Sequence, residues 1–129
     1  NLQRKYGTSV IMITHDLGVV AETCDKVAIM YAGEAVEYGT LADIFTGENH
    51  HPYAVGLFGS IPSLTEESKR LHPIEGLMPD PTEKPAGCWF APRCRHCTEK
   101  CKKQVPPVYE KNGHQIRCHL FGGEERKVR

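Results

Sequence analysis

The chain has 129 residues and a formal net charge of zero, because 16 Lys and Arg residues balance 16 Asp and Glu residues. Its 40% hydrophobic and 25% charged residues are typical of a globular protein and exclude a disordered tail. The balanced charge argues against naked DNA or an anionic membrane surface as the main partner. The longest aliphatic run, from Val10 to Ile13, is far too short to span a membrane. The chain starts at Asn1 within a helix-like run, so we expect a fragment of a longer protein.

The first expected strand covers residues 9–14, which are apolar and rich in β-branched side chains without polar alternation. This pattern predicts a strand buried on both faces, as in the parallel sheet of an α/β fold. Asp16 offers an N-cap carboxylate for a helix over residues 17–24. The apolar positions of this helix fall on one face: Leu17, Val20, Ala21 and Cys24.

A hairpin and a short helix are expected next. Residues 26–31 form a second apolar stretch, Gly33 supplies a turn, and residues 34–38 alternate between polar and apolar. The alternation predicts a hairpin strand with one face in solvent. Thr40 and Asp43 have the spacing of a capping box, which opens a short helix.

The middle of the chain combines one helix with a proline-rich connection. Pro52 stands where a first helical residue is expected. The residues after it place apolar side chains on one face of a helix, and Pro62 ends this predicted helix. Residues 63–86 contain four further prolines and predict an extended connector. From Gly87 onward, five of the six cysteines lie within 32 residues.

His15 is the first candidate for chemistry. It follows the carboxyl end of the predicted buried strand, and open α/β sheets bind ligands at that edge. Its imidazole could donate a hydrogen bond to an anion such as a terminal phosphate. From position alone, a structural histidine at a strand end is the more frequent explanation.

Several segments then carry a family resemblance. Residues 10–21, with Thr14-His15-Asp16, resemble the switch-histidine segment of ABC-type ATPases, and residues 25–39 resemble the segment that follows it. Four more segments narrow the resemblance to the ATP-binding subunits of oligopeptide, dipeptide or nickel importers: His50–Tyr53, Ile61–Ser63, Ile74–Gly76 and Gly87–Cys94. The similarity extends from about Leu2 to Leu120.

The resemblance implies a role for His15 and a setting for the protein. His15 matches the histidine that contacts the γ-phosphate of ATP and helps to position the attacking water, where positioning and charge stabilisation carry catalysis. The phosphate-binding loop, the acidic site for Mg²⁺ and the Gly-rich signature are absent from these 129 residues. We therefore expect the fragment alone to be inactive. The intact protein would use ATP and Mg²⁺ at the cytoplasmic side of the membrane, with permease subunits and a second ATPase subunit as partners; nucleic acid is not expected.

The cysteines allow several interpretations. Cys24 lies apart and is expected to be a small buried hydrophobe. Disulfides among the other five would need an oxidising compartment, which nothing in the sequence indicates. Spacing alone leaves open an iron–sulfur cluster and a zinc site that uses Cys94 and Cys97. Three histidines are alternative zinc ligands: His96, His114 and His119.

The resemblance implies a [4Fe–4S] cluster with four ligands: Cys88, Cys94, Cys101 and Cys118. Cys97 departs from the family pattern. Its presence keeps zinc as the alternative metal. Residues 87–120 hold few large aliphatic side chains, so a metal staple would supply stability that packing cannot. The expected role of the metal is therefore structural.

The sequence as a whole predicts an α/β fold, the C-terminal part of an ABC ATPase nucleotide-binding domain followed by a small irregular, Cys-rich, metal-stapled domain. The expected boundaries are 1–47 for the nucleotide-binding part, 48–86 for the His-Pro-Tyr helix and connector, 87–121 for the Cys-rich extension and 122–129 for a frayed tail. The alternative is a free-standing zinc-binding module that contacts nucleic acid or protein. The predicted buried strand with His15 and the balanced charge argue against that alternative.

Overall fold

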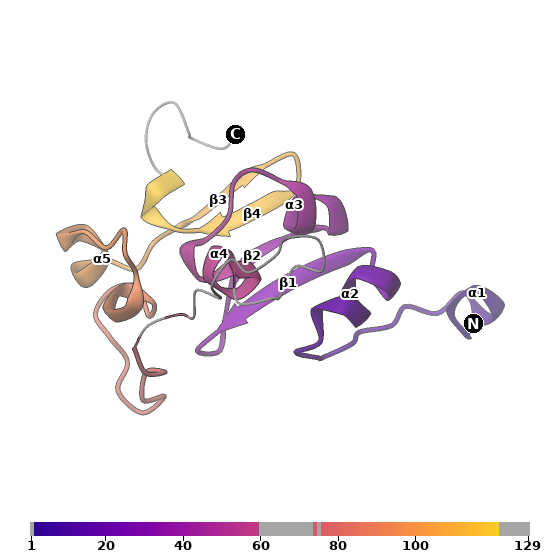
Figure 1. Ribbon diagram of the computed structural model, residues 1–129, viewed down its shortest axis with the longest axis horizontal. Coiled ribbons are helices and arrows are strands. Elements are labelled where there is room, and N and C mark those ends of the chain that lie inside the picture. Colours follow the sequence, from indigo (N-terminus) through magenta and orange to yellow (C-terminus); the bar gives the residue numbers. More distant parts are fainter. Residues whose placement is uncertain (1, 60–73, 75, 122–129) are drawn as a thin grey trace, which may run out of the picture.

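A computed structural model describes residues 2–59, 74 and 76–121 (Figure 1). The helix end expected at Pro62, most of the first half of the connector and the tail 122–129 lie outside the described residues. Within the described part of the chain, no helix has the length and apolar character needed to cross a membrane.

One four-stranded antiparallel sheet organises the fold, in the order β1-β2-β4-β3. The strands are β1 (Lys26–Tyr31), β2 (Glu34–Thr40), β3 (Val108–Lys111) and β4 (His114–Arg117). Ala32 and Gly33 connect β1 to β2 with positive φ angles of 49° and 83°, as a two-residue hairpin turn requires. The hairpin and the turn at Gly33 are therefore confirmed.

The Cys-rich segment contributes two strands to this sheet. Asn112 and Gly113 close the β3–β4 hairpin with φ angles of 53° and 85°, and β4 then pairs with β2, with Glu37 opposite Ile116. The expectation of an irregular segment is wrong over residues 108–117. The missed signal is an Asn-Gly turn between short β-prone stretches, which is typical of a hairpin.

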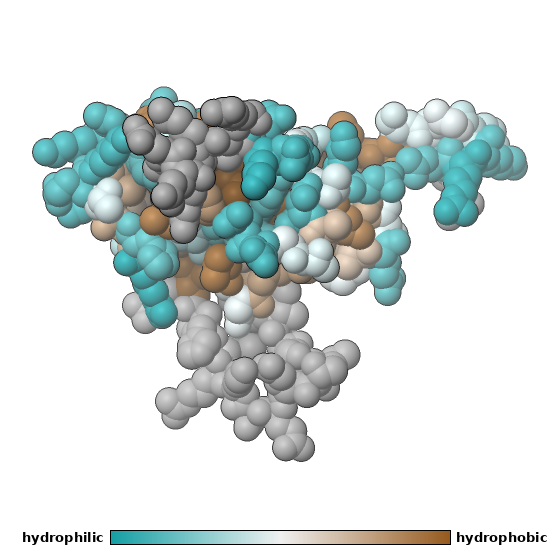
Figure 2. Space-filling view, turned by 90° about the horizontal axis from the view of Figure 1, so that it is seen from above, coloured by the Kyte–Doolittle hydropathy of each residue, from teal (hydrophilic) through white to brown (hydrophobic). Residues whose placement is uncertain are grey.

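The strand predicted over residues 9–14 is not formed. Ile11 and Ile13 are 92% and 97% exposed, and this segment runs extended between α1 (Leu2–Tyr6) and α2 (Leu17–Thr23) (Figure 1). A strand buried on both faces needs paired neighbours and cover on each face, and none of the residues described here supplies them. The expected parallel sheet is likewise wrong, because every pairing among the described strands is antiparallel. The N-terminal segment projects from the body of the molecule (Figure 2).

Helix α2 begins where the sequence predicts. The Asp16 carboxylate accepts hydrogen bonds from the backbone N–H groups of Gly18 and Val19, at 3.0 and 3.2 Å. Its apolar face is smaller than expected, because only Val20 is buried, Leu17 and Cys24 are half-buried, and Ala21 is exposed. Cys24 therefore lies at the margin of the fold rather than within a core.

Two further helices pack near the sheet. The capping box of α3 (Leu41–Thr46) is present: Thr40 Oγ1 accepts from the Asp43 N–H, and the Asp43 carboxylate accepts from the Thr40 N–H. Helix α4 (Pro52–Gly59) starts at Pro52 as predicted. The main core joins these helices to the β1–β2 hairpin and the start of the Cys-rich segment, through Ile29, Tyr31, Val36, Ile44, Ala54 and Phe90.

Candidate metal centre

A cavity of about 70 Å³ lies between the start of α4 and the Cys-rich segment. All four cysteines of the predicted ligand set line it: Cys88, Cys94, Cys101 and Cys118. Cys97 is not among the described residues that line it. Its thiol lies 3.5 Å from the carbonyl oxygen of the next residue, Thr98, and also forms a hydrogen bond with Cys101. The four cysteines implied by the resemblance therefore line the cavity, and the fifth lies beside them.

Four different pieces of structure deliver these thiols. The N–H of Cys88 donates to the carbonyl oxygen of Cys101 at 2.7 Å, which joins two segments across the cavity. Cys94 follows the short 3-10 helix η1 (Ala91–Arg93), and Cys101 lies in α5 (Glu99–Lys103). Cys118 follows directly after β4 and precedes η2 (His119–Phe121). Three of the four cysteines lie within 14 residues, and the fold brings Cys118 to them from after β4.

Backbone N–H groups point at three of the sulfurs. Burial raises the pKa of Cys88 and Cys94, and raises that of Cys118 to about 11. Hydrogen bonds from the N–H groups of Phe90 and Ala91 act in the opposite direction on Cys88 and lower its pKa. His96 supplies the same kind of bond to Cys94, and Leu120 to Cys118. The backbone is therefore arranged to stabilise thiolates, the form that binds metals, once a cation offsets the burial.

The sulfur positions bear on both metal hypotheses. A single tetrahedral zinc with Zn–S bonds of about 2.3 Å places its sulfurs about 3.8 Å apart. Among the described residues, no three cysteine sulfurs lie within 4.8 Å of one another. A [4Fe–4S] core binds each thiolate through a different iron, so its four sulfurs are held farther apart.

Three histidines also border the cavity: His51, His96 and His119. His51 is 1% exposed, burial lowers its pKa to about 4, and its Nδ1 accepts the N–H of Tyr53 at 3.0 Å, so it is neutral with its proton on Nε2. His119 Nε2 lies 2.9 Å from the carbonyl oxygen of Gln104, and its buried Nδ1 has no hydrogen-bond partner among the described residues. His119 thus remains a possible donor atom beside the cysteines, and His96 lines the same cavity.

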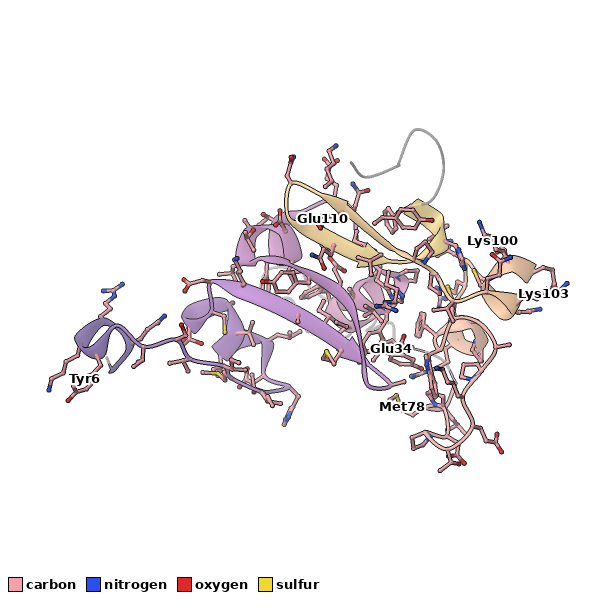
Figure 3. All side chains as sticks on the ribbon, turned by 180° about the vertical axis from the view of Figure 1, so that it is seen from behind. Tyr6, Glu34, Met78, Lys100, Lys103 and Glu110 are labelled. Atoms are coloured by element: carbon pink, nitrogen blue, oxygen red, sulfur yellow. The ribbon has the colours of Figure 1, made fainter. Side chains whose placement is uncertain are left out.

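The basic residues near the cysteines do not line the cavity as a group. Lys100 and Lys103 extend outward from α5 (Figure 3). Lys102 pairs with Glu99 at 3.2 Å on the exposed surface. These lysines are therefore a solvated face of α5 rather than the lining of an anion site.

Gly87 allows the close approach of the two chain segments beside the cavity. A Cβ atom at this position would overlap the carbonyl oxygen of Cys101 and press against Lys102 backbone atoms. We expect Gly87→Ala to lower the free energy of unfolding by about 1–3 kcal/mol, the usual cost of overpacking a well-packed site. Gly59→Ala is the matched control, because a Cβ there meets nothing within 4 Å and should change stability little. Urea denaturation of the unaltered chain and of both variants measures the free energy of unfolding. Equal values for Gly87→Ala and Gly59→Ala would contradict the prediction.

His15 lies far from this arrangement in the fold. It is exposed and comes directly before Asp16, the cap of α2. The Thr14 hydroxyl accepts the N–H of Asp16 at 3.0 Å, which fixes the turn that carries His15. His15 does not line the cysteine cavity described above. The two predicted sites are therefore separate in space.

A second cluster of ligand-type side chains was not predicted. The alternation of β2 places Glu37 on a solvent face, but Glu37 is 1% exposed. Its Oε1 lies 2.8 Å from both His50 Nδ1 and His114 Nε2, and its Oε2 accepts the N–H of His51 at 3.0 Å. The expectation of a wet face is wrong at Glu37, because β4 and the segment before α4 cover it. No spacing rule connects residues 37, 50 and 114, so nothing in the sequence pattern could have brought them together.

Comparison with known proteins adds a family assignment. Residues 36–101 match the family described as "Oligopeptide/dipeptide transporter, C-terminal region". The oligopeptide transport ATP-binding protein AppD of Bacillus subtilis is 44% identical over 96% of the chain and 38% of its own length. The dipeptide transport ATP-binding protein DppD of Haemophilus influenzae is 41% identical over 92% of the chain and 36% of its own length. The oligopeptide transport ATP-binding protein OppD of Escherichia coli is 44% identical over 96% of the chain and 36% of its own length. The chain thus spans little more than a third of the length of these relatives.

Proposed function

The chain belongs to the oligopeptide/dipeptide transporter C-terminal region family, and from this premise we propose that it is the C-terminal portion of an ATP-binding subunit that powers peptide import. The observation that carries the proposal is the identity of 41–44% over nearly the whole chain with proteins named for peptide transport and ATP binding. These names favour peptides over nickel as the imported solute. ATP and Mg²⁺, permease subunits, a second ATPase subunit and a peripheral position on the cytoplasmic side of the membrane belong to this proposal for the intact protein.

In this proposal His15 contacts the γ-phosphate of ATP in the assembled protein. Two observations support the role. Its side chain is exposed and available to a ligand, and the capped start of α2 fixes the backbone that carries it. An imidazole N–H at the γ-phosphate would position the attacking water and stabilise the charge that develops in transfer. The remaining parts of the phosphate site would come from outside the 129 residues.

The cysteine cavity holds a [4Fe–4S] cluster in this proposal, through Cys88, Cys94, Cys101 and Cys118. The shared cavity and the N–H groups directed at three sulfurs support it. The cluster would supply a four-point cross-link, which stabilises a segment that buries few aliphatic side chains. We keep the boundaries 1–47, 48–86, 87–121 and 122–129 as the proposed functional division.

A free-standing zinc module that contacts nucleic acid is not favoured. The relatives align with this chain as part of longer ATP-binding proteins, which favours a portion of such a subunit over a free-standing module. The formal net charge of zero also gives little attraction for a nucleic-acid backbone.

A chimera tests the proposed function directly. The segment of the Escherichia coli protein OppD that aligns with this chain would be replaced by the chain, in cells that lack their own copy of that protein. We expect the chimera to restore energy-dependent oligopeptide uptake, because the identity of 44% preserves the packing between the two parts. A version that ends before the exchanged segment is the control and should restore none. A stable chimera that hydrolyses no ATP and supports no uptake would contradict the proposal.

A further inference from the structure

Glu37, His50 and His114 converge from three remote parts of the chain, at the middle of β2, before α4 and at the start of β4. Among the described residues they are the one group of three or more potential ligands whose atoms all lie within 4.8 Å of one another. We propose that these three side chains bind a divalent transition-metal ion, zinc before others, at a site distinct from the cysteine cavity.

The charge of Glu37 is the first argument. Its side chain is fully buried, and a buried carboxylate is costly unless a positive charge lies beside it. Its Oε2 is occupied by the N–H of His51. Its Oε1 faces only the two imidazole nitrogens, each at 2.8 Å. A cation at Oε1 would therefore complete the environment of this carboxylate.

The hydrogen bonds of His50 are the second argument. Its Nε2 lies 2.7 Å from the carbonyl oxygen of Gly47, so Nε2 must carry a proton. In the neutral ring Nδ1 is then an unprotonated lone pair that faces the Glu37 carboxylate at 2.8 Å. A lone pair and a carboxylate oxygen at this distance need either a proton or a metal ion between them. A carbonyl bound to the far nitrogen is also the usual outer-shell partner of a metal-binding histidine.

An extra proton on His50 is the simplest alternative cation. His50 as an imidazolium and a neutral His114 with its proton on Nε2 would both donate hydrogen bonds to Glu37 Oε1 at 2.8 Å, so zinc binding itself distinguishes the two arrangements. The two rings are not stacked against each other, because their planes meet at 59° with centroids 6.2 Å apart. Both rings are instead directed at one point, which is the arrangement of a three-ligand metal site.

The ligand types and the exposure of the site agree with zinc. Two imidazoles and one glutamate form a known set for zinc that keeps a further position open. Tetrahedral bonds of about 2.0–2.1 Å would set the ligand atoms about 3.3 Å apart, so each nitrogen must move about half an ångström away from Glu37 Oε1, from which it lies 2.8 Å. The His50 and His114 side chains are each 14% exposed, which gives the ion a path from solvent. Such an ion would join β2, β4 and the entry to α4.

The test is zinc binding by the purified full chain under anaerobic conditions, with zinc content, competition against a chromophoric chelator, and zinc X-ray absorption as readouts. We expect one equivalent of zinc with a shell of nitrogen and oxygen only, near 2.0–2.1 Å, without a sulfur shell near 2.3 Å. Glu37→Gln should weaken this binding by at least about 100-fold. Glu34→Gln, a carboxylate variant on the same strand, and Cys97→Ser, at a cysteine outside the cavity lining, should leave it unchanged.

Three outcomes would overturn the proposal: a zinc shell made of sulfur, a Glu37→Gln variant that binds zinc as the unaltered chain does, or no zinc bound at micromolar concentration. The zinc X-ray absorption spectrum of the unaltered chain identifies the ligand atoms even if Glu37→Gln does not fold. His114→Gln provides a second ligand variant with the same expected loss. The proposal does not depend on peptide import, so failure of the chimera leaves it standing.

Discussion

Replacing Cys101 with serine will remove iron from the anaerobically purified chain, whereas Cys97→Ser will leave the iron content unchanged. Cys101 lines the shared cavity and Cys97 does not. The two residues lie close together in sequence, and both are half-buried, so the pair is matched for exposure. Loss of one of four thiolates removes a point of attachment that a serine hydroxyl replaces poorly.

The expected effect of Cys101→Ser on stability is large. Structural metals in small domains contribute apparent free energies of about 10 kcal/mol or more, so loss of the cluster should unfold the segment from residue 87 to residue 121. Iron and sulfide per chain, visible absorption and circular dichroism measure this. One equivalent of zinc without iron in the unaltered chain would contradict the cluster, and loss of iron in Cys97→Ser would contradict the ligand set.

The second large effect is expected at His15. In the chimera with OppD, His15→Ala should reduce ATP turnover by about 100-fold or more, in line with the loss of one preorganised group at a developing charge. Nucleotide binding should persist, because one imidazole supplies a small part of the contacts to ATP. Glu22→Gln, an exposed change on the neighbouring helix α2, is the control and should retain turnover. A His15→Ala chimera with unchanged turnover would remove His15 from the chemistry.

Local signals in the sequence predicted much of the secondary structure. The Thr40–Asp43 capping box, the Asp16 cap and Pro52 each fix a helix start by interactions within a few residues, and all three are confirmed. The β1–β2 hairpin is likewise a local structure set by its turn at Gly33. Such features need no knowledge of the rest of the fold.

Features that depend on distant partners could not be predicted in the same way. The pattern of residues 9–14 specifies a strand only where neighbouring strands and covering helices exist, and the described residues leave Ile11 and Ile13 exposed. The prediction for Glu37 is wrong in the opposite direction. The alternating pattern of β2 predicts an exposed side chain at this position, but contacts with His50 and His114 bury it. In both cases tertiary contacts outweigh the local pattern.

The cysteine site shows where family resemblance adds to spacing. Spacing left zinc and iron–sulfur open and could not choose among five cysteines. The resemblance implied four of them, and those four line the cavity, whereas Cys97 lies beside Cys101 without lining it. The convergence of Cys118 with the three earlier cysteines depends on the fold and is not written in the sequence pattern.

The pairing of β2 with β4 has a consequence for synthesis on the ribosome. Translation delivers about 5–20 residues per second, and Glu37 must await Ile116 and His114, which emerge much later. For several seconds the nascent hairpin therefore presents a bare sheet edge and a Glu37 carboxylate without the imidazole of His114. Non-local pairing of this kind slows folding and exposes strands to unwanted association. The nascent chain therefore needs its β2 edge protected until β4 has been translated.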